Sequence, residues 1–142
     1  MKPKKVVIFI DGASRGNPGP AGLGVVIKDE NKKTIKEFYK YIGNATNNIA
    51  EYNALVYGLQ EALIIGAEEV ILNLDSELVA QQLKGEFRVK DPRIKSLFDQ
   101  AVHLINAFKK FDVIHINREK NKEADKLANK AINLSELKRQ VK

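Results

Sequence analysis

The chain has 142 residues, a length typical of one domain with a hydrophobic core of its own. It contains no cysteine, which excludes disulfide bonds and thiolate metal sites and suits a reducing, cytoplasmic location. The net charge of +6 favours a polyanionic partner, but it fits equally a soluble protein that is away from its isoelectric point. No apolar run approaches the roughly 20 residues of a membrane-spanning helix, so we expect no membrane partner.

The first third of the chain predicts three strands. Residues 4–10 form a nearly continuous run of Val, Ile and Phe, which indicates a strand buried on both faces. A loop rich in Gly and Pro follows over residues 12–20, and a second strand over residues 22–28. The polar residues 29–33 form a hairpin turn, from which residues 34–42 return as the third strand.

The rest of the chain alternates between helices and strands. This order predicts an α/β fold, in which an antiparallel three-strand meander is extended by two parallel strands through helical crossovers. We expect one domain over residues 1–132 and a charged tail over residues 133–142, which extends the last helix or frays. The expected elements are helix 46–65 ended by Gly66, strand 70–74, helix 76–83, helix 91–110, strand 113–116 and helix 122–132.

Two acidic residues directly follow apolar strands. Asp11 follows the first strand and Asp75 follows strand 70–74. Ligands of open α/β sheets bind beyond the carboxyl ends of the strands, so parallel neighbours would place these carboxylates a few Å apart. Taken singly, each has a simpler explanation: Asp11 as a turn residue that caps its own backbone, and Asp75 as a helix N-cap.

Two further acids lie in the first turns of helices. Glu51 projects within the apolar arc of helix 46–65, where a carboxylate costs several kcal/mol unless it is paired or bound to a metal. A capping box with Asn48, three residues earlier, explains its position but not its inward direction. Asp125 lies at the edge of the apolar stripe of the last helix, where the helix dipole alone would favour it.

Four converging carboxylates would repel one another strongly. Hard oxygen ligands of this kind suit Mg²⁺ or Mn²⁺. Mg²⁺ also favours phosphate oxygens, which indicates phosphoryl transfer, and two such ions about 3.5–4 Å apart would activate a water and stabilise a leaving alkoxide.

Four segments resemble the motifs of type 1 ribonuclease H, in the same order along nearly the whole chain. Residues 11–22, DGASRGNPGPAG, resemble the N-terminal signature of that family. Residues 46–51, TNNIAE, resemble its T-N-N-x-x-E segment, and Asp75-Ser76 matches its third acidic position. Residues 115–125, HINREKNKEAD, resemble the H-V-x-R-E-x-N-x-x-A-D ending of one branch.

The resemblance implies a ribonuclease H-like fold with a mixed five-stranded sheet. It implies an endonuclease that cuts the RNA strand of RNA–DNA hybrids and leaves 5′-phosphate and 3′-hydroxyl ends. Asp11, Glu51, Asp75 and Asp125 would be the catalytic ligands of two Mg²⁺ ions, with Mn²⁺ as a substitute and Asp11 between the two metals. The residues implied to contact the substrate are Gly12, Ser14, Asn17, Thr46, Asn47, Asn48 and Ser76.

The chain departs from the family pattern at two places, one implied to act in substrate binding and one in proton transfer. Many members carry a long basic insertion that this chain lacks around residues 84–92, so binding would rely on bases such as Arg88 and Lys90. Many members also have a loop histidine before the last acid. Arg118 or Glu119 would replace it here, because no histidine lies between Asn117 and Asp125. We expect His115 to have a structural role on its strand.

Two other readings stay open from the sequence. One is a module that binds hybrids or double-stranded RNA without cutting them, although all four acids are present. The other is a reverse-transcriptase nuclease domain separated from its polymerase. The motifs reach close to both ends of the chain, so we expect a free-standing, monomeric enzyme. The missing basic insertion leaves open whether double-stranded RNA is also a substrate.

Overall fold

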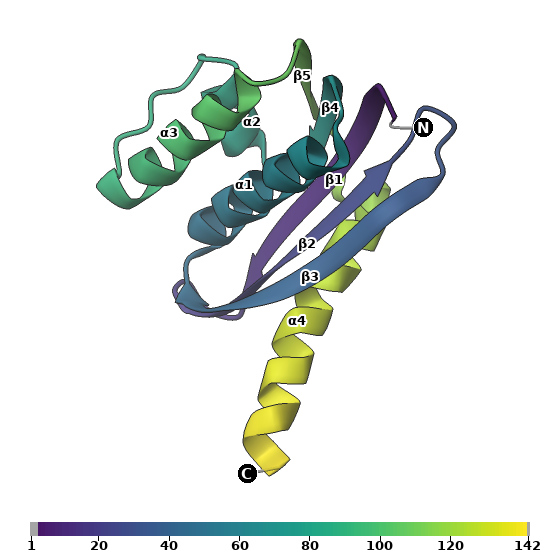
Figure 1. Ribbon diagram of the computed structural model, residues 1–142. Helices are drawn as coiled ribbons and strands as arrows, with labels where there is room; N and C mark the ends of the chain where they lie inside the picture. The colour runs from purple at the N-terminus through teal and green to yellow at the C-terminus, as the bar shows by residue number, and fades with distance from the viewer. Residues whose placement is uncertain (1–2, 142) are drawn as a thin grey trace.

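The computed structural model describes residues 3–141 and shows one mixed sheet packed between helices (Figure 1). The elements confirm the predicted order of strands and helices. In chain order they are β1 Lys5–Ser14, β2 Gly19–Lys28, β3 Thr34–Ala45, α1 Asn47–Ile65, β4 Glu69–Leu74, α2 Glu77–Leu83, α3 Pro92–Ile105, β5 Lys110–His115, the short 3₁₀ helix η1 Arg118–Lys120, and α4 Lys122–Val141.

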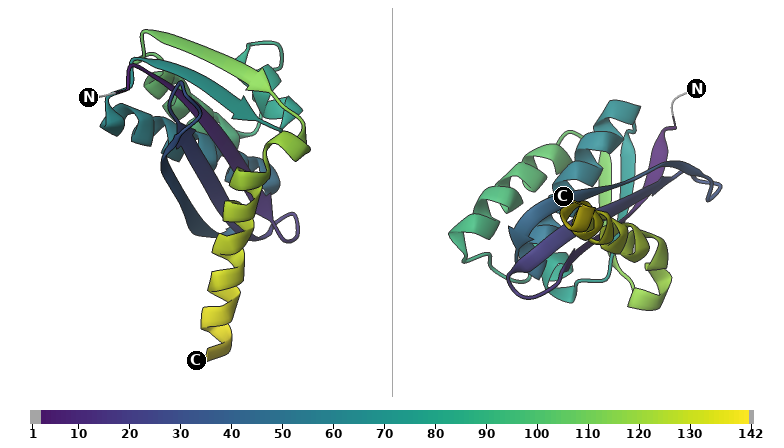
Figure 2. Two further views of the ribbon diagram at one scale, coloured as in Figure 1. Left: turned by 90° about the vertical axis from the view of Figure 1, so that its right-hand side faces the viewer. Right: turned by 90° about the horizontal axis from the view of Figure 1, so that it is seen from below.

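The sheet has five strands in the order β3-β2-β1-β4-β5. The pairs β1–β2 and β2–β3 are antiparallel, whereas β4 pairs in parallel with both β1 and β5. The predicted fold class is therefore confirmed. Helix α1 covers one face of the sheet and carries α3 on its outer side, while α4 crosses the opposite face and projects beyond the sheet (Figures 1 and 2).

The hydrophobic core lies between the sheet and α1. Apolar side chains at alternate positions of the central strands point toward this helix, as the period of a half-buried strand requires. The opposite face of β1 is only half-buried at Val7 and Phe9, so the prediction of a strand buried on both faces was wrong. The fully buried side chains that meet in the core include Val6, Ile8, Ile10, Tyr52, Leu55, Leu59, Leu72 and Leu74.

The strand β1 continues past the apolar run from which it was predicted. Asp11 was placed directly after the strand and residues 12–14 in a loop, but residues 11–14 pair with β2 in the register Asp11↔Gly24 to Ser14↔Ala21. Backbone hydrogen bonds to β2 hold this segment, and such bonds do not need apolar side chains. Asp11 therefore lies inside a strand and does not follow its end.

The C-terminal third differs from the sequence prediction in two boundaries. Helix α3 ends at Ile105, five residues before the predicted end, and β5 begins already at Lys110. The predicted tail extends the last helix, because α4 is continuous from Lys122 to Val141. Within residues 3–141, no helix combines the length and the apolar composition that a membrane crossing requires.

Two glycines let helices approach the sheet at backbone distance. A Cβ atom at Gly12 would lie 2.3 Å from the backbone of Ala50 and Glu51, and one at Gly24 would lie 2.2 Å from the carbonyl oxygen of Ala124. Gly12 therefore allows the start of α1 to touch β1, and Gly24 allows α4 to lie directly on β2. Close backbone approach, more than turn formation, explains the glycine at position 12.

We predict that Gly12→Ala destabilises the protein by about 2–4 kcal/mol, because the added methyl group meets backbone that cannot rotate away. Gly58→Ala, in the middle of α1, is the matched control. Its Cβ would meet only side-chain methyl groups, at 3.3 Å or more, and alanine favours the helix by about 1 kcal/mol. Urea unfolding of both variants measures the difference, and equal stabilities would contradict the close approach at Gly12.

Candidate metal centre and active site

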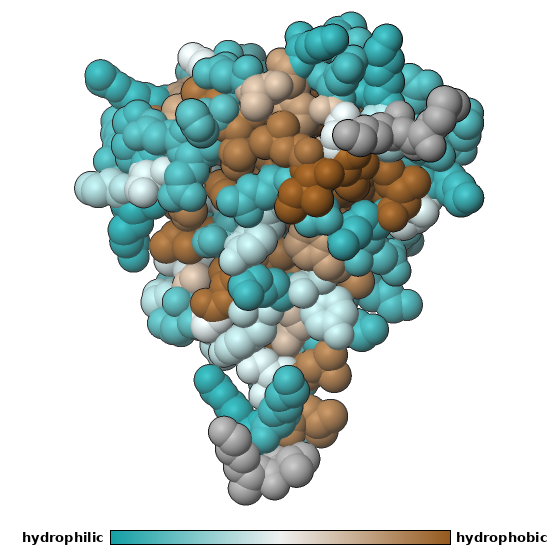
Figure 3. All heavy atoms as spheres, in the orientation of Figure 1, coloured by the Kyte–Doolittle hydropathy of each residue, from teal (hydrophilic) through white to brown (hydrophobic). Residues whose placement is uncertain are grey.

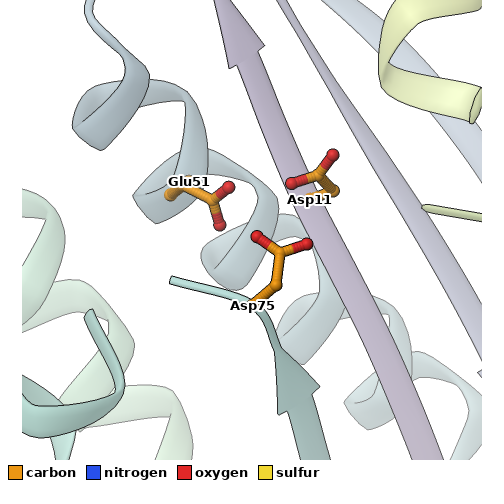
Figure 4. Close-up of side chains that lie close together, drawn as sticks. All are labelled: Asp11, Glu51 and Asp75. Carbon is orange, nitrogen blue, oxygen red and sulfur yellow. The ribbon is translucent and has the colours of Figure 1, made fainter. Parts of the chain in front are cut away.

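Three of the four predicted acids meet at one point of the sheet. Asp11 comes from β1, Glu51 from α1, and Asp75 directly follows β4 (Figure 4). One carboxylate oxygen of each lies within 4.8 Å of those of the other two. The parallel register Phe9↔Asn73 explains the meeting of the two aspartates, since each lies two residues beyond this pair.

Glu51 is directed into the protein, as its position in the apolar arc predicted. It is 6% exposed, and its Oε1 accepts a hydrogen bond of 3.0 Å from the backbone N–H of Gly12. Its Oε2 is buried without a hydrogen-bond partner. The capping-box explanation is wrong, because Thr46 is the N-cap and its side chain accepts from the backbone N–H of Ile49.

The cluster is electrostatically strained without a cation. Asp11 is 5% exposed. Burial, followed by the nearby charges of Glu51 and Asp75, raises the pKa of Asp11 far above its ordinary value. Burial also raises the pKa of Glu51, against the lowering effect of its hydrogen bonds. A buried carboxylate set with an orphaned oxygen fits a divalent cation that binds hard oxygen ligands.

Asn121 holds Asp75 in place, a role that its polar surroundings in the sequence did not predict. Its Nδ2 donates to the backbone oxygen of Ile10 at 2.8 Å and to Oδ2 of Asp75 at 2.9 Å. The side chain is 1% exposed although it lies in a polar segment without apolar periodicity. Asp75 is not the N-cap of α2, because that role belongs to Ser76, whose hydroxyl accepts from Val79.

Asp125 lies beside the three-acid cluster. It is half-buried in the first turn of α4, and the side chain of Asn129 donates to its carboxylate at 3.3 Å. Asp125 also contributes to the raised pKa of Asp11. It lines the same cavity of about 470 Å³ as the other three acids. The four acids thus surround one cavity, with Asp125 at its edge.

The residues expected to contact substrate lie around this cavity and a neighbouring one. Gly12, Ser14 and Ser76 line the cavity of the acids. Asn17 and Thr46 line a second cavity of about 510 Å³. Asn47 and Asn48 line both. The second cavity also includes Gln82, Arg88, Lys90 and Arg93.

The two residues expected to replace the loop histidine differ in position. Both belong to η1. Arg118 lines the cavity of the acids, and its charge lowers the pKa of the Glu51 carboxyl. Glu119 is exposed. His115 lies on β5 as expected. Its Nε2 is 3.2 Å from the backbone oxygen of Asp75, so His115 contacts the segment that carries this acid.

We predict that Asp11→Asn stabilises the metal-free protein by about 1–2 kcal/mol near neutral pH. The folded protein holds protons on Asp11 and Glu51 that the unfolded chain releases above about pH 4, so the stability of the parent falls as the pH rises. The advantage of the variant should therefore grow with pH. Thermal melts in a chelator from pH 5 to pH 8 measure it.

The matched control for this prediction is Asp112→Asn, which removes an exposed carboxylate from β5. We expect it to change stability by less than about 0.5 kcal/mol at every pH. A lower stability of Asp11→Asn than of the parent at pH 8 would contradict strain in the acid cluster.

Known proteins are similar to this chain over nearly its whole length. The family described as reverse transcriptase-like matches residues 9–131. A bifunctional protein of Mycobacterium tuberculosis is 44% identical over 129 residues, which cover 90% of this chain and 35% of that protein. The chain thus spans about a third of the length of this relative.

Relatives of known structure give the same result for the fold. Ribonuclease HI of the archaeon Halobacterium salinarum is 40% identical over 90% of this chain and 64% of its own sequence. Its crystal structure superposes with a TM-score of 0.89 and covers 91% of this chain and 98% of the solved chain. LC11 ribonuclease H1, solved in complex with an RNA/DNA hybrid, is 42% identical with a TM-score of 0.88, covering 92% and 98% of the two chains. The chain therefore belongs to the type 1 ribonuclease H family.

Proposed function

We propose that this chain is an endonuclease that hydrolyses the RNA strand of RNA–DNA hybrids with the help of two divalent cations. The observation that carries the proposal is the buried set of Asp11, Glu51 and Asp75, in which one oxygen of Glu51 has no partner. The 42% identical LC11 ribonuclease H1 has been solved with such a hybrid, which supports the substrate class.

Asp11, Glu51, Asp75 and Asp125 would hold the cations. When bound, Mg²⁺, or Mn²⁺ as its substitute, would lower the pKa of an attacking water and stabilise the leaving 3′ oxygen, which gives 5′-phosphate and 3′-hydroxyl ends. The charges of Glu51 and Asp75 and a hydrogen bond with Asp125 all favour the protonated form of Asp11. This place among the other three acids supports Asp11 as the ligand common to both ions. Arg118 brings positive charge to the same cavity, where phosphate charge would collect.

The side chains that line the second cavity would bind the hybrid. Asn17, Asn47 and Asn48 offer short amides that suit the 2′-hydroxyls and base edges of a minor groove. Arg88 and Lys90 on the same cavity suit a phosphate backbone. The backbone N–H and the guanidinium of Arg93 donate to the carboxylate of Asp91 at 2.9–3.4 Å, so this guanidinium already has a partner. We therefore propose Arg88 and Lys90 as the main phosphate contacts in place of the missing insertion. A monomeric state and a cytoplasmic location stay predictions.

Cleavage of labelled hybrids tests the proposal. We expect the parent protein to cut the RNA strand, and not the DNA strand, of an end-labelled hybrid in the presence of Mg²⁺ or Mn²⁺. Asp11→Asn should reduce the rate by about 1,000-fold or more, because several kcal/mol of metal-derived stabilisation are lost. Asp112→Asn is the control and should cleave like the parent. Mass spectrometry of the products should show 5′-phosphates on the downstream fragments.

Each alternative reading has its own outcome in this assay. Binding of the hybrid without cleavage would overturn the enzyme and favour a binding module. Equal rates for the parent and Asp11→Asn would overturn the proposed site. A parallel reaction with double-stranded RNA decides whether that duplex is also a substrate.

A further inference from the structure

The turn between β1 and β2 is fastened to the start of α1 on one side. The backbone N–H of Ser14 donates to Oδ1 of Asn47 at 3.0 Å, and the backbone N–H of Asn47 donates to Oδ1 of Asn17 at 3.1 Å. The hydroxyl of Ser14 also donates to the backbone oxygen of Ala45 at 2.7 Å. These bonds place Asn17 at the edge of the second cavity.

The same turn is fastened on its other side to the end of α4. Nη1 of Arg15 lies 3.0 Å from Oε2 of Glu136, and its Nη2 donates to Oδ1 of Asn133. Both partners belong to residues 133–141 of α4, which lie in the predicted charged tail. We call these residues the α4 extension. Figure 2 shows α4 passing beside the turn before it projects from the sheet.

We propose that the α4 extension positions the hybrid-binding turn through Arg15, which is a positioning residue and not a phosphate contact. This inference rests on the proposed function. The guanidinium of Arg15 binds two acceptors on α4. These two contacts fix its orientation as well as its distance from the helix. The backbone of Arg15 is held as well, by a bond of 2.9 Å from its N–H to the carbonyl oxygen of Pro20. Asn17, two residues further on, is therefore held between two anchored points.

Loss of the contact between Arg15 and Glu136 should weaken substrate binding rather than global stability. Arg15 and Glu136 have side chains that are 36% and 45% exposed, and ion pairs of this kind contribute little to folding. A turn that is ordered in advance, however, loses less conformational entropy when substrate binds. Loss of the contact should then raise KM and leave kcat unchanged, since Arg15 is not among the residues that line the cavity of the acids.

Glu136→Gln separates positioning from simple electrostatics by the sign of its effect. The substitution removes a negative charge, so charge alone would strengthen binding of a polyanionic hybrid and lower KM. A freed Arg15 that bound phosphate would also lower KM. The positioning role predicts the opposite, an increase in KM of about two- to fivefold with kcat unchanged.

Steady-state cleavage of a hybrid by a set of variants tests the inference. We expect Arg15→Leu and Glu136→Gln to raise KM by similar factors, and the double variant to raise it no further. The exchanged pair Arg15→Glu with Glu136→Arg should recover part of the loss. Lys36→Ala is the matched control for lost positive charge, because it breaks the ion pair of 3.2 Å with Glu61, away from the turn. It should leave KM nearly unchanged.

The possible failures are distinguishable. A parent protein that does not cleave hybrids would overturn the proposed function. A parent that cleaves them, with a KM that is lowered or unchanged in Glu136→Gln, would overturn the positioning role alone. Hydrogen exchange at the backbone amides of Gly16 and Asn17 supplies a readout that does not depend on cleavage. We expect faster exchange in Glu136→Gln than in the parent, and equal rates would also contradict the inference.

Discussion

The close approach of α1 to β1 at Gly12 is the contact on which the acid cluster depends. Without a side chain at this position, the backbone of Glu51 comes so near that a Cβ atom on Gly12 would lie only 2.3 Å from it. The backbone N–H of Gly12 then binds one oxygen of Glu51, whose other oxygen stays buried without a partner. The parallel register of β1 and β4 brings Asp75 to the same place. Three buried or half-buried carboxylates therefore face one another because of backbone geometry.

Such an arrangement opposes folding, and the core must offset it. Asp11 and Glu51 favour their protonated forms, because burial raises the pKa of both and like charge raises that of Asp11 further. The fully buried side chains that α1 packs against the sheet, among them Tyr52, Leu55 and Leu59, supply the opposing hydrophobic free energy. Asn121 adds a rigid link between β1 and Asp75. Cations that bind hard oxygen ligands would offset this cost, which supports the proposed metal-dependent reaction.

The sequence predicted those features that follow from local periodicity. The inward direction of Glu51 came from its place in an apolar arc, and the extension of the meander by two parallel strands came from the alternation of strands and helices. Side-chain contacts between distant segments that neither periodicity nor the family motifs record could not be predicted. Nothing in the polar residues around Asn121 signals a buried side chain, because its partners lie 111 and 46 residues away in sequence.

The same limit explains the errors at element boundaries. The strand β1 continues through Asp11 because β2 pairs with it, and no pattern in residues 11–14 records that pairing. The continuation of α4 to Val141 was left undecided, because a charged segment that extends a helix looks like one that frays. The link from Arg15 to Glu136 joins residues that are 121 positions apart. Only the folded chain shows that this segment reaches the turn that carries Asn17.

We propose that the acid cluster holds protons until cations replace them. Isothermal titration of Mg²⁺ into the protein at pH 7, in two buffers with different ionisation enthalpies, tests this claim most directly. We predict that the observed binding enthalpy differs between the buffers by an amount that corresponds to protons released on binding, because the raised pKa of Asp11 and that of Glu51 must fall when a cation arrives. Mg²⁺ binding with the same enthalpy in both buffers, and therefore without proton release, would contradict it.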